Sequence, residues 1–261
     1  MKYFLKKIYF FILKLGFDPL KLLYSIKLFV PFFINYIRFR KLSKSHTSFN
    51  KISINAQLFD LHSDAGDVKT HYFWQDLIVA KKINDLGIKL HNDIGSRIDG
   101  FIAHLASSNI IVNIFDIRKL EYNIPNVNFT QLDLMNNIPK DLEHSCHSLS
   151  CLHTLEHFGL GRYGDDIDTN GYVKGLTQMN KLVKKNGYFF LSVPVGKQRV
   201  EFNAHRVFDP HYIYSLLEKD FNLNEFVLID DNCNVKYFKS LDNNKFSELN
   251  YSCGIFIFKK K

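Results

Sequence analysis

From about residue 72 onward, short apolar segments of β type alternate with amphipathic helical segments. This alternation is typical of a mostly parallel sheet with helices on both faces. We expect about seven strands, at residues 88–94, 110–116, 127–132, 148–152, 188–193, 225–229 and 254–258. Helices are expected at residues 73–86, 100–107, 171–185 and 210–218. The pattern therefore predicts a Rossmann-like α/β fold.

The N-terminal part has a different pattern. Apolar residues recur at helical spacing between Phe4 and Leu15, and Asp18-Pro19 is typical of the start of a second helix, in which Pro31 is expected to cause a kink. The longest run without a charge, Leu28–Ile37, is about half of what a bilayer span needs. A signal peptide also fits this segment poorly.

Two regions follow from these patterns. Residues 1–50 are expected to form a helical arm and a linker, and residues 51–261 the α/β domain. The four cysteines form no CxxC pair, which fits neither a zinc site nor a disulfide framework and favours a reducing cytoplasm.

The positive charge of the chain lies almost entirely in the arm. Residues 1–51 contain eleven Lys and Arg and one acid, Asp18, whereas residues 52–261 contain 23 basic and 25 acidic residues. A nucleic-acid partner is not expected, because such domains usually carry a basic face of their own. The arm has two interpretations. Residues 1–45 either contact an anionic membrane surface, or pack on the domain or a second subunit. The sequence leaves the oligomeric state open.

Acidic residues end three consecutive predicted strands. The first lies in the run Asp93-Ile94-Gly95-Ser96-Arg97-Ile98-Asp99-Gly100, the second is Asp116, and the third is Asp133 in Gln131-Leu132-Asp133-Leu134. An acid and a glycine turn after the first strand, and an acid after the second, are typical of a nucleoside-bearing cofactor, because glycine lets the backbone approach the ligand and a carboxylate accepts from ribose hydroxyls. We therefore expect Asp93, Gly95, Ser96, Gly100, Asp116, Asp133 and Leu134 to bind the cofactor.

The turn itself favours one cofactor over another. The sequence after Gly95 lacks the middle glycine of the GxGxxG turn that accommodates a pyrophosphate. Asp93 would repel a diphosphate, but it suits the ammonium group of S-adenosylmethionine. S-adenosylmethionine is therefore the expected cofactor.

Residues 72–261 resemble the class I methyltransferases. More narrowly, the chain resembles an uncharacterised family, domain of unknown function 268, in the run 93–100, in Ser150–Asp165, in Ser192–Gly196, in Phe202–Phe208 and in Gly254–Phe258. The resemblance implies a methyltransferase-like fold, often encoded near surface-polysaccharide genes in bacteria. The chain departs from the methyltransferase pattern because its glycine triplet is reduced to Gly95 and Gly100. This departure motivates a second hypothesis, a binding or assembly protein on a scaffold that no longer turns over.

Candidate catalytic residues follow the fourth and fifth strands. They are His153, Glu156, His157, His205 and Arg206, with His153 or His205 as the expected base because imidazole titrates near neutrality. Histidines in such positions also often only hold a loop. The loop with Arg162, Tyr163 and Asp165 suits a polar acceptor such as a sugar, or forms a rigid turn.

The segment from His153 to His157 also matches the zinc pattern H-x-x-E-H, which needs a helix. The glycines that follow it argue against a helix there, so we expect no metal. The fourth strand is not followed by the Asn/Asp-Pro-Pro-aromatic string that the wider family links to nitrogen methylation. The sequence therefore predicts methyl transfer to a hydroxyl of a small molecule, saccharide or glycolipid, in the cytoplasm or at the inner face of its membrane.

Overall fold

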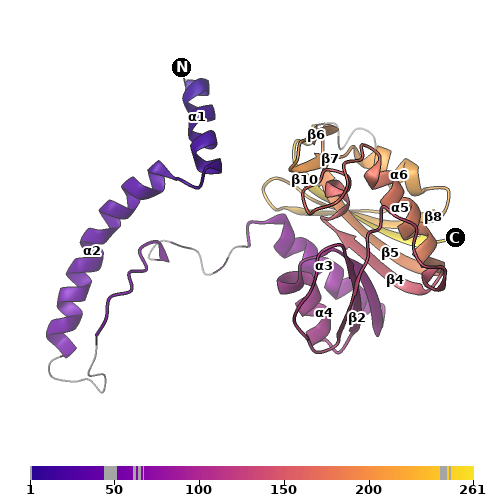
Figure 1. Ribbon diagram of the computed structural model, residues 1–261, viewed down its shortest axis with the longest axis horizontal. Coiled ribbons are helices and arrows are strands. Elements are labelled where there is room, and N and C mark those ends of the chain that lie inside the picture. Colours follow the sequence, from indigo (N-terminus) through magenta and orange to yellow (C-terminus); the bar gives the residue numbers. More distant parts are fainter. Residues whose placement is uncertain are drawn as a thin grey trace. The chain divides into compact units, whose positions relative to one another are not determined.

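The structure is a computed structural model that describes residues 2–43, 52–60, 63, 66, 68–241, 246 and 248–261. Its contacts divide the chain into two compact units, residues 1–67 and 68–261 (Figure 1). The predicted boundary after Asn50 lies outside the described residues, and the contact-based division falls later, after Asp67.

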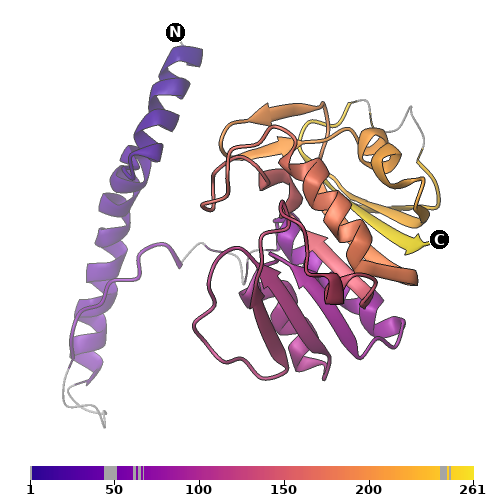
Figure 2. The ribbon, with the colours of Figure 1, turned by 45° about the vertical axis from the view of Figure 1, so that its right-hand side comes forward.

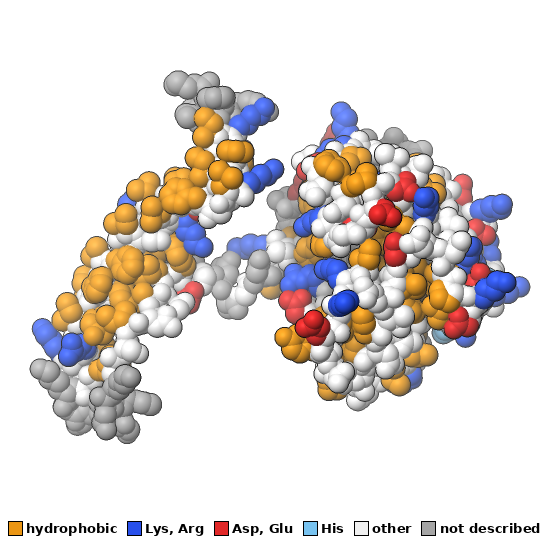
Figure 3. Space-filling view, in the orientation of Figure 1, with side chains coloured by type: hydrophobic (Ala, Val, Ile, Leu, Met, Phe, Trp, Pro, Cys, Tyr) orange, Lys and Arg blue, Asp and Glu red, His pale blue; other side chains and the backbone are white. Residues whose placement is uncertain are grey.

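The N-terminal unit contains two helices, α1 (Lys2–Lys14) and α2 (Pro19–Ser43). The predicted start of α2 is confirmed, because the Lys21 amide donates to Asp18 Oδ1 over 3.0 Å. The helix continues through Pro31. Of the α2 side chains, Leu28 is buried, and hydrophobic side chains cover much of the visible face of both helices (Figure 3).

By length and composition, α2 is apolar enough to cross a membrane, and it is the one helix of the described chain that is. The helix is longer than its uncharged run Leu28–Ile37, on which the expectation from the sequence was based. The longer helix tolerates a few basic residues such as Lys27 and Arg38 and still has a high mean hydropathy over an 18-residue window. Long basic side chains reach outward from apolar surroundings, which makes this tolerance physically reasonable.

The second unit is built on an eight-stranded sheet with the order β3-β2-β1-β4-β5-β10-β8-β9 (Figures 1 and 2). The strands are β1 (Leu90–Ile94), β2 (Ile111–Asp116), β3 (Val127–Gln131), β4 (Cys146–Leu152), β5 (Val183–Val195), β8 (Phe221–Ile229), β9 (Val235–Phe238) and β10 (Ser252–Lys260). The strands β1, β2, β3, β4 and β5 are mutually parallel, whereas β10 runs antiparallel to both of its neighbours, β5 and β8. This arrangement confirms the predicted Rossmann-like fold with a mostly parallel sheet.

Helices cover both faces of this sheet because successive strand residues point to opposite sides. One core joins Phe189, Leu191 and Phe256 to α5 (Gly171–Leu182) and α6 (Pro210–Leu217). The other core joins alternate residues of the same strands to α3 (His71–Asp85) and to the segment formed by the π-helix η2 (Ile98–Ile102) and α4 (Ala103–Ser107).

Three short strands were not predicted, and one helix ends early. A separate hairpin pairs β6 (Arg199–Glu201) with β7 (His205–Val207), and β9 lies at the edge of the main sheet. Helix α5 ends at Leu182 and β5 begins at Val183, so the residues predicted as the last helical turn belong to the strand. Pairing with the buried strand β4 thus overrides the helix-like periodicity of these residues.

A row of buried polar side chains joins β1 to β4. Ser150 donates to the Asp93 carboxylate, so its oxygen accepts from His91 Nε2 over 2.8 Å. The other ring nitrogen, Nδ1, then accepts from the Ser148 hydroxyl over 2.6 Å. Burial lowers the pKa of His91 to about 3, which keeps the ring neutral as this chain of bonds requires. The row fixes how β1 and β4 lie beside each other.

Candidate functional site

A cleft enclosing about 910 Å³, partly open to solvent, lies at the carboxyl ends of β1, β2, β3 and β4. Gly95, Asp116, Asp133, Leu134, His153 and His157 are the predicted site residues that line it. Parallel sheets bind ligands at this edge, so the predicted location of the site agrees with the structure.

The structure places Asp93 beneath the cleft and not among its described lining residues, unlike its predicted position at the cofactor. Its carboxylate is fully buried and accepts from the Ser96 amide over 2.9 Å, from the Ser96 hydroxyl over 2.7 Å and from Ser150. Burial raises the pKa of Asp93 to about 6. Neither Asp93 nor Ser96 is among the described residues that line the cleft. The hydrogen bonds between Asp93 and Ser96 stabilise the turn after β1.

Gly95 forms the floor of the cleft next to this turn. Its φ of +67° favours glycine, and a Cβ there would lie 2.5 Å from Thr154 Cγ2. Thr154 follows β4 and also lines the cleft. The turn after β1 and the turn after β4 therefore touch, without a side chain from residue 95 between them.

Gly100 was predicted to bind the cofactor, but it is not among the described residues that line the cleft. It leaves room instead for the carboxylate of Asp76, which a Cβ at position 100 would meet. Asp76 lies on α3, is buried, lines the cleft and accepts from Gln75 Nε2 over 3.0 Å. Burial raises its pKa.

Asp76 was missed by the sequence analysis. A signal existed, because Gln75 and Asp76 continue the helix face that carries Val79, Ala80 and Ile83 at spacings of three and four. Polar residues on an apolar helix face are candidates for a site.

Asp116 lies at the end of β2 and lines the cleft, as predicted. Arg118 forms a fork on it, with Nε 3.0 Å from Oδ1 and Nη2 2.6 Å from Oδ2. The Arg118 amide also donates to Oδ1 over 2.8 Å. Arg118 itself lines the cleft and was not predicted as a site residue.

Asp133 and Leu134 follow β3 and both line the cleft, as predicted. The Met135 amide donates to Asp133 Oδ1, and the Asn136 side chain donates to Oδ2, each over 2.8 Å. One bond to each oxygen leaves further acceptor positions on this carboxylate.

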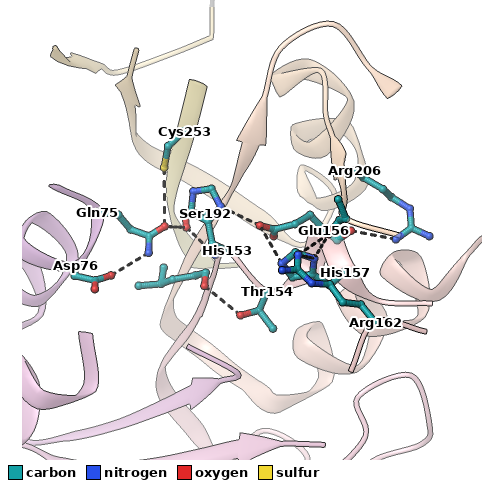
Figure 4. Close-up of polar contacts among 12 residues, drawn as sticks. Gln75, Asp76, His153, Thr154, Glu156, His157, Arg162, Ser192, Arg206 and Cys253 are labelled. Carbon is teal, nitrogen blue, oxygen red and sulfur yellow. Dashed lines mark hydrogen bonds and ion pairs between the residues drawn. The ribbon is translucent and has the colours of Figure 1, made fainter. Parts of the chain in front are cut away.

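His153 and Glu156 form a buried pair beyond β4 (Figure 4). The Nδ1 atom of His153 lies 2.9 Å from Glu156 Oε1, and both side chains are nearly inaccessible to solvent. Burial alone would lower the pKa of His153, but the neighbouring Cys253 and Glu156 raise it well above 6.5. Burial alone would raise the pKa of Glu156, but His153 lowers it below 4.5. The contact with Glu156 therefore orients the His153 ring, and its role as a base stays a prediction.

His157 is better placed to accept a proton. It lines the cleft at the end of η4 (Leu155–His157), and burial lowers its pKa below 6.5. Nδ1 lies 2.8 Å from the carbonyl oxygen of Ala204, so this nitrogen carries the hydrogen. The lone pair of a neutral ring then belongs to Nε2.

His205 and Arg206 are not among the described residues that line the cleft. Arg206 is buried, and its guanidinium donates to the carbonyl oxygen of Phe158 over 2.5 Å and lies on the Tyr172 ring. His205 lies on the small hairpin, and its ring contacts the ring of Tyr251. Both residues were predicted because they follow β5 in sequence, but their strand β7 packs on η4 behind the residues that line the cleft.

The loop after η4 is a rigid turn built on Asp165. This carboxylate accepts from the amides of Gly159, Gly161 and Tyr163 over 2.8–3.1 Å. Tyr163 and Asp165 also line the cleft, so the two predicted interpretations of this loop, as a turn or as part of the site, are compatible.

The zinc-like segment does not form the helix that the zinc pattern needs. It contains the short 3-10 turn η4, which ends at His157. Throughout the parts of the chain that the structure describes, no three metal-ligating side chains gather around a common point.

Two solved structures of similar fold support the architecture. The Burkholderia thailandensis 1,6-didemethyltoxoflavin-N1-methyltransferase, with 1,6-didemethyltoxoflavin and S-adenosylhomocysteine bound, matches with a TM-score of 0.51 at 15% identity, over 75% of this chain and 81% of that one. The [4+2]-cyclase SpnF matches with a TM-score of 0.50 at 10% identity, over 70% of this chain and 80% of that one. The fold is therefore that of the class I methyltransferases, as predicted, and a cyclase also uses it.

Residues 105–232 match the family described as "Caenorhabditis protein of unknown function, DUF268". The narrower resemblance noted in the sequence is confirmed over this segment, which includes β2 to β8. None of the functionally curated proteins matches the chain.

The buried pair gives a prediction for stability. Replacing Glu156 with Gln should lower the free energy of unfolding by about 3–5 kcal/mol near pH 6, because one partner of a buried ion pair is removed. Glu156 contributes above pH 4.5 and loses its effect as the pH falls through its lowered pKa. His153 contributes below pH 6.5 and loses its effect as the pH rises through its raised pKa.

Urea unfolding of both proteins between pH 3 and 10 measures this difference. The exposed pair of Lys81 and Asp85 is the control, since Asp85→Asn should change stability by less than about 1 kcal/mol. A Glu156→Gln effect that is small, or that does not vary with pH, would contradict the ion pair.

Proposed function

We propose that the chain is an S-adenosylmethionine-dependent methyltransferase that acts on a hydroxyl group. The observation that carries this proposal is the cleft, where Gly95, Asp116 and Asp133 meet at one edge of the sheet. Gly95 lines the cavity with backbone alone, and two carboxylates face the same cavity. These residues fit a nucleoside with a zwitterionic tail.

Each end of the donor has a proposed partner. Asp116 would accept from the ribose hydroxyls, and Asp133 with Leu134 would contact the adenine. Asp76 replaces Asp93 as the partner of the ammonium group, because it is a buried carboxylate that faces the cleft beside the glycine turn. A buried carboxylate with one side-chain donor gains most from a cationic ligand.

S-adenosylmethionine supplies an activated methyl group on sulfur. The chain would position the acceptor hydroxyl and take up its proton at Nε2 of His157, while the new carbon–oxygen bond replaces the carbon–sulfur bond. Ala204 holds the His157 ring in the required tautomer. Glu156, at 3.8 Å from His157 Nε2, would stabilise the imidazolium that forms.

We further propose a saccharide or glycolipid as the acceptor. The near-neutral composition of residues 52–261 and the polar loop around Tyr163 support a neutral, hydroxyl-rich portion in the acceptor. A second hypothesis is a binding or assembly protein without turnover, motivated by the reduced glycine turn.

We also propose that residues 1–45 contact an anionic membrane surface, which would place the protein at the inner face of the membrane. The described helices of the arm expose hydrophobic side chains and carry several basic ones, which is the composition of a helix at a lipid surface.

Donor binding tests the first proposal. Titration calorimetry of the full chain with S-adenosylhomocysteine should show saturable binding, and Asp116→Asn should weaken it by roughly tenfold to a hundredfold, since bonds to a charged acceptor are lost. Asp99→Asn is the control, because Asp99 is exposed and is not among the residues that line the cleft. No binding at millimolar ligand would favour the scaffold hypothesis.

Methyl transfer tests the base. Labelled S-adenosylmethionine is incubated with extracted glycolipids and oligosaccharides, and label in the acceptor fraction is counted. His157→Ala should lower the rate by about 10²–10⁴-fold, as is usual for a general base. His205→Ala should leave the rate within a few fold. The opposite ranking would assign the proton transfer to His205.

Vesicle sedimentation tests the arm. Replacing Lys6, Lys14, Lys27 and Arg40 with Gln should weaken binding of the full chain to phosphatidylserine vesicles by roughly 10²-fold or more, at about 1 kcal/mol per charge. Vesicles of phosphatidylcholine provide the control surface, on which both proteins should bind alike. Equal binding of both proteins to the anionic vesicles would refute an electrostatic membrane contact.

A further inference from the structure

Arg118 already donates hydrogen bonds to the Asp116 carboxylate, which the ribose of the donor would also need. The Asp116 carboxylate offers about four lone-pair positions. Three are used within the protein, two on Oδ1 by the Arg118 amide and Nε, and one on Oδ2 by Nη2. One position is left on Oδ2. A ribose diol donates two hydrogen bonds, so it can make both only if the guanidinium moves.

The Arg118 side chain has a second contact besides Asp116, namely the Tyr163 ring. The Arg118 side chain is about half exposed, whereas that of Asp116 is 12% exposed. The guanidinium carbon of Arg118 lies 4.7 Å from the centre of the Tyr163 ring, and the guanidinium carbon of Arg162 lies 5.2 Å from the same centre. A guanidinium that leaves Asp116 can therefore keep its contact with Tyr163.

If Arg118 leaves Asp116, its positive charge near Tyr163 is no longer neutralised by that carboxylate. Arg162 donates to the carbonyl oxygen of Ala204 over 2.8 Å, which is a neutral group. The oxygens of Asp165, an acid of the same loop, already accept from three amides. Released from Asp116, Arg118 would leave a second guanidinium without an acidic partner at the Tyr163 ring, which Arg162 also contacts. Two guanidiniums at one ring suit a phosphate group, which accepts their forked donors.

We propose that Arg118 is a latch that the donor's ribose displaces, and that the released guanidinium joins Arg162 at Tyr163 to bind a phosphate group of the acceptor. The inference rests on the proposed function, because the displacing group belongs to the donor. It deepens that function in two ways. The donor binds before the acceptor, and the acceptor carries a phosphate ester in addition to its hydroxyl groups.

The latch is tested first with S-adenosylhomocysteine, which lacks the sulfonium charge and has no net charge, so it responds less than S-adenosylmethionine to the lost arginine charge. Calorimetry on the full chain should show that Arg118→Ala binds it roughly threefold to tenfold more tightly than the unaltered protein, because a competing ion pair is gone. Arg118→Lys, which keeps the charge without the fork, should lie between the two.

The matched control is Arg199→Ala. Arg199 also contacts an acid two residues along the chain, Glu201, but it is not among the residues that line the cleft. Its removal should leave the affinity unchanged. Thermal unfolding of each variant verifies that it is folded. An unchanged or weaker affinity in folded Arg118→Ala and Arg118→Lys would overturn the latch.

The phosphate site is tested with inorganic pyrophosphate. Saturating S-adenosylhomocysteine should raise the affinity for pyrophosphate at least fivefold, and Arg118→Ala and Arg162→Ala should each abolish that increase. By linkage, pyrophosphate should raise the affinity for S-adenosylhomocysteine by the same factor. Pyrophosphate binding that is independent of the nucleoside, or of both arginines, would overturn this part.

The outcomes separate the two levels of the argument. If neither the unaltered protein nor Arg118→Ala binds S-adenosylhomocysteine, the proposed function fails and the latch fails with it. If the unaltered protein binds it and Arg118→Ala does not bind it more tightly, the latch alone fails. Binding only after Arg118 is removed would support both.

Discussion

The site depends on a buried row of hydrogen bonds between two central strands. Through Ser150, the Asp93 carboxylate is linked to His91 and then to Ser148, so β1 and β4 cannot slide past each other without leaving polar groups unpaired in the core. The same carboxylate holds Ser96 in the turn after β1. One charged group therefore fixes both the relative position of the strands and the floor of the cleft. Asp93 thus shapes the site, although it is not among the described residues that line the cleft.

Much of the architecture could be predicted because it depends on local pattern. The parallel strands appear where apolar β-type segments alternate with helices, and acids at the ends of β2 and β3 face the cleft since parallel strands end at one edge. Asp93 was misjudged for a physical reason. A carboxylate at a strand end can face a ligand or cap its own turn, and Ser96 three residues later decides for the cap.

The remaining errors come from contacts between residues far apart in the sequence. Asp76 reaches the cleft only because α3 packs beside η2, where Gly100 leaves space for it. Arg206 follows β5, but its guanidinium is bound by carbonyl oxygens of the loop after β4. For His153 and Glu156, spacing predicts that they meet, whereas the raised pKa of His153 also depends on Cys253, which is distant in the sequence.

The contact between Gly95 and Thr154 has a consequence for how this site can change. Because the two turns touch directly, the floor under the nucleoside and the backbone that carries the histidines form one continuous wall. A side chain added at position 95 would push against the very segment that orients His157. The two halves of the cavity must therefore adapt together, and remodelling one for a new ligand requires a compensating change at Thr154.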